Sequence, residues 1–217
     1  MIRTQDLRFT YSGDQAYHFD DVQIAQGQTV FIHGPSGSGK TTFLHLLSGV
    51  LSCQSGNITL LDQVFSDFST IQRDHFRRDH MGYIFQQFNL VPYLSVQDNI
   101  ALPLALSSIK RNNFTGDIKA LATTLQLQDV LHHKAVNLSQ GQKQRVAIAR
   151  ATIGNPKIIL ADEPTSALDQ ENTDICMRIL LDQCQQQGST LMFVSHDVAL
   201  QPYFDISIST RNLVHIA

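Results

Sequence analysis

The sequence has no excess of positive charge and no long hydrophobic run. Its 217 residues carry a formal net charge of −3 at pH 7, so no overall basic field indicates a nucleic-acid partner. The longest apolar run, "IALPLAL" at 100–106, contains a proline and is far shorter than the ~18 residues of a membrane span. The first residues, "MIRTQDLRF", lack the apolar stretch of a signal peptide. We therefore expect no nucleic-acid binding, no membrane span and no leader peptide.

Cysteine is scarce, and histidine is not clustered. Cys53, Cys176 and Cys184 are odd in number and lack C-x-x-C spacing, which is typical of reduced, buried thiols in a cytosolic protein. Nine histidines raise the question of a metal site, but only His132 and His133 are adjacent. Adjacent residues rarely converge on one ion, so we expect no structural metal.

Apolar patterns along the chain predict an α/β fold. Strands are expected at 7–11, 21–24, 29–33, 57–61 and 81–85. Continuous apolar runs at 157–162 and 190–195 are typical of strands buried on both faces of a parallel sheet. Helices are expected at 40–51, at 171–187 and over most of 95–150, with a polar break at 107–113. "ISIST" and "LVHI" predict a closing hairpin around Arg211 and Asn212, with no further domain after it.

The segment "LSQGQ" at 138–142 opens one of the predicted helices. Ser139 and Gln142 have the spacing of a capping box, so a well-capped core helix would account for them. Gly141 does not fit that account, because glycine in a first helical turn costs up to ~1 kcal/mol relative to alanine. Glycine suits a position that another group approaches closely, and a helix N-terminus favours anions. The segment therefore predicts either a simple cap or a contact with phosphate.

"GPSGSGKTT" follows a predicted strand and precedes a predicted helix, as the P-loop pattern requires. The glycines let backbone amides curl around phosphate oxygens, Lys40 supplies a positive charge, and the Thr41 hydroxyl can ligate Mg²⁺. A chance match is expected in roughly one chain per hundred of this length. The sequence therefore predicts a site for a nucleoside triphosphate. Its candidate residues are Gly34, Pro35, Ser36, Gly37, Ser38, Gly39, Lys40, Thr41 and Thr42.

An acidic pair follows the apolar run at 157–162. Asp162 and Glu163 are expected at the carboxyl end of a buried strand, where α/β proteins bind their ligands. Asp162 is a candidate Mg²⁺ ligand through water. Glu163 is a candidate catalytic group, placed to polarise a water against the γ-phosphate. Such pairs also cap helices, so the pair gains weight only beside the P-loop.

Four further motifs occur in a fixed order. They are Gln86 in "YIFQQFNLVP", the block "LSQGQKQRVAIARA", "TSALD" ending in Asp169, and "VSHD" with His196. Together with the P-loop they resemble the ATP-binding-cassette (ABC) ATPases over essentially the whole chain. "FQQFNLVP" followed by "SVQDNIALPL" is most similar to the branch of lipoprotein-release and macrolide-export machines. The resemblance implies one ATPase domain over residues 1–217. Its P-loop NTPase core would carry an antiparallel β subdomain and a helical insertion at roughly 87–150.

The resemblance also implies roles for single residues. Tyr11 matches the aromatic residue that stacks on adenine. Gln86 matches the glutamine that contacts Mg²⁺ and the attacking water, and His196 matches the histidine that contacts the γ-phosphate. Asp169 matches the loop that links the two sites of a dimer.

In this family the signature segment, here residues 138–142, faces ATP bound to the other subunit. The resemblance therefore implies a homodimer that encloses two Mg-ATP head to tail. Ser139, Gln140, Gly141 and Gln142 would contact the partner's nucleotide. The family usually has glycine where this chain has Gln140, and this departure bears on the rate of hydrolysis.

Because the chain contains no membrane span, transport would need a separate integral membrane permease. Several large apolar residues at Phe88–Leu94 show no β alternation and are typical of an interface. We expect the permease to dock there, at the cytoplasmic side of the inner membrane. The coupled process would be export, lipoprotein release or mechanotransmission. Two alternatives are a soluble ABC ATPase acting on DNA or ribosomes, and a regulatory subunit that binds ATP with weak hydrolysis.

Overall fold

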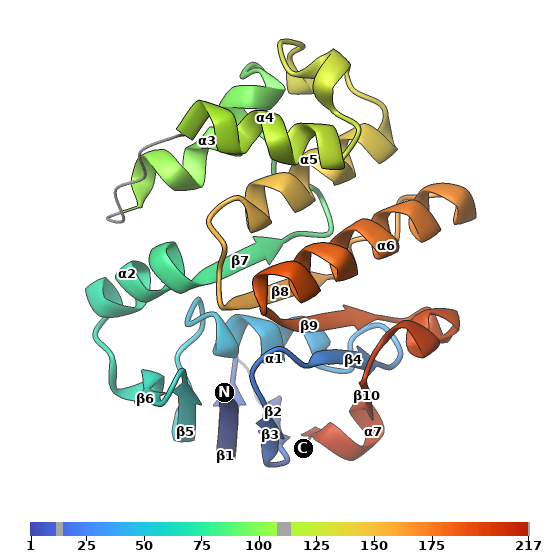
Figure 1. Ribbon diagram of the computed structural model, residues 1–217. Helices are drawn as coiled ribbons and strands as arrows, with labels where there is room; N and C mark the ends of the chain where they lie inside the picture. Colours follow the sequence, from blue (N-terminus) through green and yellow to red (C-terminus); the bar gives the residue numbers. More distant parts are fainter. Residues whose placement is uncertain (12–14, 108–113, 217) are drawn as a thin grey trace. The chain divides into compact units, whose positions relative to one another are not determined.

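The computed structural model describes residues 1–11, 15–107 and 114–216. The chain forms two compact units, one of residues 1–77 and 190–217 and the other of residues 78–189. Helix α2 (Thr70–His80) continues from the first unit into the second. Figure 1 shows the elements in chain order. The turn expected at 11–15 and the polar break expected at 107–113 fall mostly outside the described residues.

The first unit contains an antiparallel sheet in the order β11-β2-β1-β5-β6, with β3 also paired to β1. Its strands are β1 (Ile2–Thr10), β2 (Ala16–Phe19), β3 (Val22–Ile24), β5 (Ser55–Leu60), β6 (Gln63–Val64) and β11 (Val214–Ile216). Buried and accessible residues alternate along β2 and β3, because one face of the sheet is packed and the other is solvated.

The first unit also contains three parallel strands, with β4 between β10 and β9. They are β4 (Thr29–His33), β9 (Thr190–Ser195) and β10 (Ile206–Ser209). All six residues of β9 are buried, which confirms a strand covered on both faces. The helical segments of this unit, besides α2, are α1 (Lys40–Leu47), η1 (Phe65–Asp67), η4 (Val198–Tyr203) and α7 (Thr210–Leu213).

The second unit combines a parallel strand pair with most of the helices. β7 (Met81–Ile84) pairs with β8 (Ile158–Asp162), and all five residues of β8 are buried. The helical segments are α3 (Val96–Leu106), α4 (Phe114–Thr124), η2 (Gln128–Val130), η3 (Ala135–Asn137), α5 (Gln140–Thr152) and α6 (Gln170–Gln187). Helices α3, α4 and α5 lie together (Figure 1), and α5 also packs against α6 and β7. Helices therefore dominate residues 96–152, as expected.

The predicted closing hairpin is wrong. β10 pairs in parallel with β4, whereas β11 pairs antiparallel with β2 in the other sheet. Helix α7 separates them: the Ser209 hydroxyl accepts the Arg211 N–H at 3.4 Å, and Thr210 and Leu213 are buried. The residues between the strands contain no glycine for a tight hairpin turn, and burial of Thr210 and Leu213 favours a helical turn instead.

Among the elements that the sequence patterns missed are α2 and β2, and the patterns extended α1. Phe76 is the single buried residue of α2, so the helix has no apolar stripe to detect. Strand β2 has only four residues. The helix predicted at 40–51 ends at Leu47, because Gly49 turns the backbone with a φ of 67° and Val50 is exposed.

Candidate functional site

Residues 34–39, the phosphate loop, connect β4 to α1 in the first unit. Gly39 precedes the helix with a φ of 86°, and a β-carbon there would lie 3.0 Å from Val214 and 3.2 Å from Tyr17. A left-handed backbone with little room for a side chain explains the glycine. Gly37 is also left-handed, with a φ of 79°. Backbone amides in such turns form concavities that bind anions.

The side chains of the loop fit a phosphate group. Lys40 is buried, and its Nζ donates to the carbonyl oxygens of Gly34 at 2.9 Å and Pro35 at 3.0 Å. The positive charge is thereby folded over the loop. The Ser38 hydroxyl is buried and makes no hydrogen bond to any residue that the structure describes. An unsatisfied buried group costs about 1–3 kcal/mol, and a bound phosphate oxygen would accept its hydrogen.

Tyr11 and Thr42 are linked beside this loop. The Tyr11 hydroxyl lies 3.1 Å from Oγ1 of Thr42. The Tyr11 ring meets Phe9 and Tyr17 edge-on, with centroid separations of 4.7 Å and 5.9 Å. It remains 43% exposed, so an aromatic base could reach it. The expected adenine contact of Tyr11 stays a prediction.

His196 follows a strand that pairs with the strand before the phosphate loop. β4 and β9 run in parallel, and His33 is paired with Ser195. The residues that follow, Gly34 and His196, therefore emerge side by side at the same edge. His196 is exposed, and the next residue, Asp197, caps η4 by accepting the Ala199 N–H at 3.0 Å. The first unit thus combines the phosphate loop with an accessible imidazole.

In the second unit, Gln86, Asp162 and Glu163 follow or end two paired parallel strands. β7 and β8 are parallel, with Ile84 opposite Ala161. Both strands therefore end at the same edge of the sheet. Asp162 is buried at the end of β8, and Gln86 is exposed. Burial, and then the negative charge of Asp162, raise the pKa of the nearby Tyr83.

Glu163 adopts a left-handed backbone with a φ of 44°. Its carbonyl oxygen accepts the Ser166 hydroxyl at 3.0 Å and the Ser166 N–H at 3.2 Å. Non-glycine residues in this region carry strain of about 1–3 kcal/mol, and such residues cluster at functional sites. The turn therefore fixes the direction in which the Glu163 side chain leaves the backbone, immediately after Asp162.

The predicted capping box at the start of α5 is confirmed. Ser139 Oγ accepts the Gln142 N–H at 3.3 Å, and Gln142 Oε1 accepts the Ser139 N–H at 3.0 Å. Ser139 and Gln140 are exposed, whereas Gly141 is buried. A β-carbon at Gly141 would collide with the side-chain amide of Asn172 on α6. The close contact with Asn172 therefore explains why residue 141 is glycine without any partner chain or ligand.

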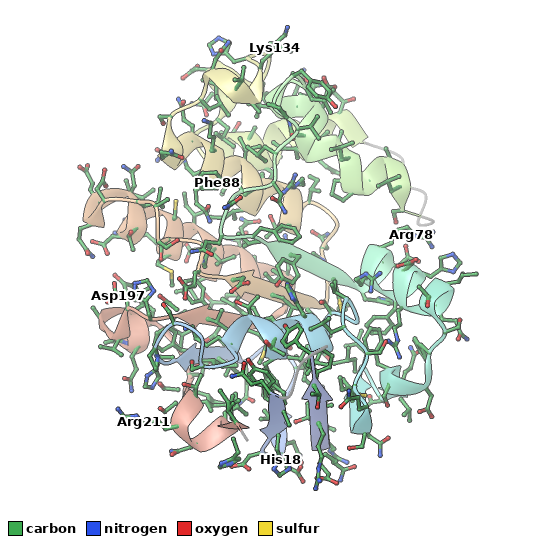
Figure 2. All side chains as sticks on the ribbon, turned by 180° about the vertical axis from the view of Figure 1, so that it is seen from behind. His18, Arg78, Phe88, Lys134, Asp197 and Arg211 are labelled. Carbon is green, nitrogen blue, oxygen red and sulfur yellow. The ribbon has the colours of Figure 1, made fainter. Side chains whose placement is uncertain are left out.

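Sequence reasoning missed residues that hold the loop after Gln86. Phe88, labelled in Figure 2, and Asn89 are both left-handed, with φ of 54° and 48°. Arg150 from the last turn of α5 donates to both of their carbonyl oxygens at 2.6 Å. An arginine inside the apolar run "VAIARA" is the sequence signal that could have indicated a specific contact.

Asn99 of α3 is a second residue that the sequence reasoning missed. It is fully buried, and its side-chain amide accepts the Val91 N–H at 2.8 Å and donates to the Val91 carbonyl at 3.1 Å. Hydrogen bonds to both the N–H and the carbonyl of Val91 fix the backbone at this residue. The sequence signal for this residue was a polar asparagine next to the apolar stretch "IALPLAL", because a polar group buried there needs hydrogen-bond partners.

Residues 88–94 expose part of their apolar surface. Tyr93 is 72% exposed, and Val136 beside it is 57% exposed. Backbone hydrogen bonds join these two segments. The Val136 N–H donates to the Pro92 carbonyl at 3.0 Å, and the Ala135 N–H donates to the Leu94 carbonyl at 3.0 Å. Phe88 and Leu94 are half-buried. The segment therefore supplies an apolar surface centred on Tyr93.

The cysteines of the chain are reduced, and the described residues contain neither a metal cluster nor a membrane-spanning helix. Among residues 1–11, 15–107 and 114–216, no three His, Cys, Asp or Glu side chains converge in a way that could hold a metal ion. All three cysteines are free thiols, and burial raises the pKa of Cys176 to about 11 and of Cys184 to about 12. In the same described ranges no helix is long and apolar enough to span a membrane.

A glycine-rich loop between a buried parallel strand and a helix defines the chain as a P-loop nucleotide-binding protein. A family model described as "ABC transporter" matches residues 18–166. The chain therefore belongs to the ABC transporter family.

Curated relatives agree with this assignment. YvcR of Bacillus subtilis (strain 168), described as an uncharacterized ABC transporter ATP-binding protein, is 37% identical over 203 residues, which cover 91% of this chain and 78% of YvcR. LolD of Hydrogenovibrio crunogenus, the ATP-binding protein of a lipoprotein-releasing system, is 37% identical over 185 residues, or 85% of this chain and 80% of LolD.

Solved structures are also similar. A dimeric structure of MJ0796, a bacterial ABC transporter cassette, has a TM-score of 0.87 and 31% identity, covering 100% of this chain and 98% of the MJ0796 chain. A dimer of MJ0796 in a post-hydrolysis state with ADP and phosphate has a TM-score of 0.86. The expected α/β ABC ATPase fold is confirmed, as are ATPase activity and the use of ATP with Mg²⁺.

Proposed function

We propose that two copies of the chain enclose two Mg-ATP head to tail and hydrolyse them to drive a separate integral membrane permease. The observation that most strongly supports nucleotide binding is the parallel pairing of β4 with β9. It puts the phosphate loop and His196 on neighbouring strand ends. Lys40 would neutralise the β- and γ-phosphates, Thr41 would ligate Mg²⁺, and His196 would contact the γ-phosphate.

Hydrolysis needs a group that orients and deprotonates water. Glu163 has this role in our proposal: water attacks the γ-phosphorus, its proton passes to the carboxylate, and the bond to the bridging oxygen of ADP breaks. Gln86 and Asp162 would hold Mg²⁺, Asp162 through water. The parallel pairing of β7 with β8, which leaves Gln86 and Asp162 at one edge, supports their joint role.

The signature segment would act on the nucleotide of the other copy. Ser139 and Gln140 are exposed at the N-terminus of α5, where the helix dipole and free amides favour a phosphate. Gly141 and Gln142 would complete this surface, and Asp169 would lie in the loop that links the two sites. The dimeric structures of MJ0796 support an assembly of two copies.

The permease would dock on the segment at residues 88–94, so that the chain sits peripherally at the cytoplasmic side of the inner membrane. The exposed Tyr93 and Val136 support a protein interface there. Residues 1–217 would act as one ATPase domain with residues 87–150 as its helical subdomain. The similarity to LolD supports a coupled process of export, lipoprotein release or mechanotransmission.

A phosphate-release assay on the purified chain tests the proposal, with Lys40→Ala as the inactive control. Turnover that depends on Mg²⁺ and is lost in Lys40→Ala is expected. Size exclusion with ATP and Mg²⁺ should show two copies associating. Membrane flotation after co-expression with permeases encoded next to its gene should bring the chain to the membrane fraction. Equal phosphate release by both proteins would overturn the proposed hydrolysis.

A further inference from the structure

Arg150 joins the end of α5 to the loop that carries Gln86. Its two terminal nitrogens donate to the carbonyl oxygens of Phe88 and Asn89, each at 2.6 Å. The planar guanidinium presents its donors as a rigid fork, so it can hold two consecutive carbonyls at once. A helix and a loop 61 and 62 residues apart in sequence are thereby tied together.

The held carbonyls lie at the end of a tight turn. The Phe88 N–H donates to the Phe85 carbonyl at 3.2 Å, so Gln86 occupies the first central position of this turn. The turn starts at the end of β7, which is fixed by its pairing with β8. Its other end consists of Phe88 and Asn89 in the left-handed region, a conformation that persists only when surrounding contacts impose it. Arg150 supplies such a contact.

Arg150 bonds to backbone oxygens and not, within the described chain, to a carboxylate. Among the described residues no carboxylate forms an ion pair with it. Burial lowers the pKa of the guanidinium, which means that the protein desolvates a cation to reach two peptide oxygens. Arg150 and Arg78 both line a cavity of about 210 Å³. Arg78, labelled in Figure 2, is paired with Asp79 at 2.9 Å. The two arginines of this cavity therefore differ in what they hold.

We propose that Arg150 is a positioning residue for ATP hydrolysis, which acts by fixing the turn that presents Gln86. The inference rests on the proposed role of Gln86. Arg150 touches neither nucleotide nor metal in this scheme. Its removal would let the left-handed residues relax toward commoner backbone conformations and would turn the Gln86 side chain away. Nucleotide affinity, which depends mainly on the phosphate loop, would be preserved.

The test is a double-mutant cycle on the purified full-length chain. Arg150→Met removes the donors and keeps an unbranched side chain, and Gln86→Ala removes the positioned group. Steady-state kcat and KM for ATP are measured at saturating Mg²⁺ for both variants and for the double variant, with thermal midpoints alongside. Arg150→Lys is the conservative variant, and Arg78→Met is the matched control in the same cavity.

Arg150→Met should lower kcat about 10-fold and change KM by less than about 2-fold. The double variant should be no slower than Gln86→Ala, because residues that act as a unit are not additive. Arg150→Lys should recover part of the rate, and Arg78→Met should stay within about 2-fold of the parent. A merely structural role would lower the thermal midpoint without this kcat change or this non-additivity.

Three results would overturn the inference. A folded Arg150→Met variant with the parental kcat would do so while leaving the proposed function of Gln86 in place. So would additive losses in the double variant. Parental activity of Gln86→Ala would overturn the role of Gln86 itself, and the positioning role with it. Should Arg150→Met fail to fold, the cycle is run with Arg150→Lys, for which the same non-additivity is required.

Discussion

Asn172 occupies the space in which a side chain at Gly141 would have to lie. A β-carbon there would be 3.0 Å from Cγ of Asn172, with Oδ1 closer still. Asn172 cannot easily move away, because its backbone N–H and its Nδ2 donate to the Asp169 carboxylate at 2.8 Å and 3.0 Å. These hydrogen bonds also lower the pKa of Asp169. The signature segment therefore packs against the residue that anchors Asp169.

Gly141→Ala is expected to destabilise the chain by about 1–3 kcal/mol, the usual cost of overpacking. Adding Asn172→Ala removes the colliding amide, so the double variant should regain much of the lost thermal midpoint. The added methyl group would lie against α6 inside the chain, so phosphate release should recover together with the thermal midpoint. Thermal unfolding and phosphate release are measured on the same samples. Equal thermal midpoints for Gly141→Ala and the double variant would refute the steric explanation.

Glu163→Gln should lower the rate of phosphate release by ~10²–10⁴-fold, the usual contribution of a general base. The amide keeps the shape of the side chain but cannot take a proton from water. ATP binding, measured with a fluorescent analogue, should be unchanged, and ATP should hold two copies together on size exclusion. Turnover at the parental rate would remove Glu163 from its proposed role.

Mixing two inactive variants tests whether residues 138–142 act on the neighbour's nucleotide. Lys40→Ala damages the site of its own chain, whereas Ser139→Arg blocks the surface offered to the other chain. Each homodimer has two damaged sites and should be nearly inactive. A mixed dimer has one site with an intact Lys40 and an intact Ser139 from opposite chains, so phosphate release should return, at least as a single turnover. Mixtures that contain heterodimers and stay inactive would reduce Ser139 to a helix cap.

Gln140→Gly should leave phosphate release equal to the parental rate or moderately higher. Gln140 is exposed, and its side chain would crowd an approaching phosphate that a glycine would admit. The measurement is kcat at saturating ATP, with thermal midpoints as a check on folding. A large loss of activity would show that the Gln140 side chain makes a contact of its own.

The stability of the chain should fall at alkaline pH, in part through Cys184. Burial raises the pKa of this thiol from 9.0 to about 12. Above pH 9.0 the unfolded chain loses a proton that the folded chain keeps, so the stabilisation is complete below that pH and is lost as pH rises toward 12. Near pH ~10.5 the loss from this group is about 2 kcal/mol. Urea midpoints between pH ~8 and ~11 should fall less steeply for Cys184→Ala, and parallel curves would contradict the assignment.

Features that depend on neighbouring residues were predictable from the sequence. The glycines around Lys40, between a predicted strand and a predicted helix, were enough to predict the phosphate loop. Ser139 and Gln142 lie one helical turn apart, so their mutual capping needs nothing else. The apolar runs that end at Asp162 and just before His196 predicted strands β8 and β9, because a parallel strand is covered on both faces and therefore carries apolar residues throughout.

Features that depend on pairing between distant segments required the tertiary structure. Only the folded chain shows that β10 joins β4 while β11 joins β2, because strand pairing is chosen by the surrounding core rather than by the intervening turn. The contacts of Gly141 with Asn172, and of Arg150 with the loop after Gln86, join residues on separate elements. Such contacts depend on how α5 packs against α6 and β7, and no spacing along the sequence encodes that packing directly.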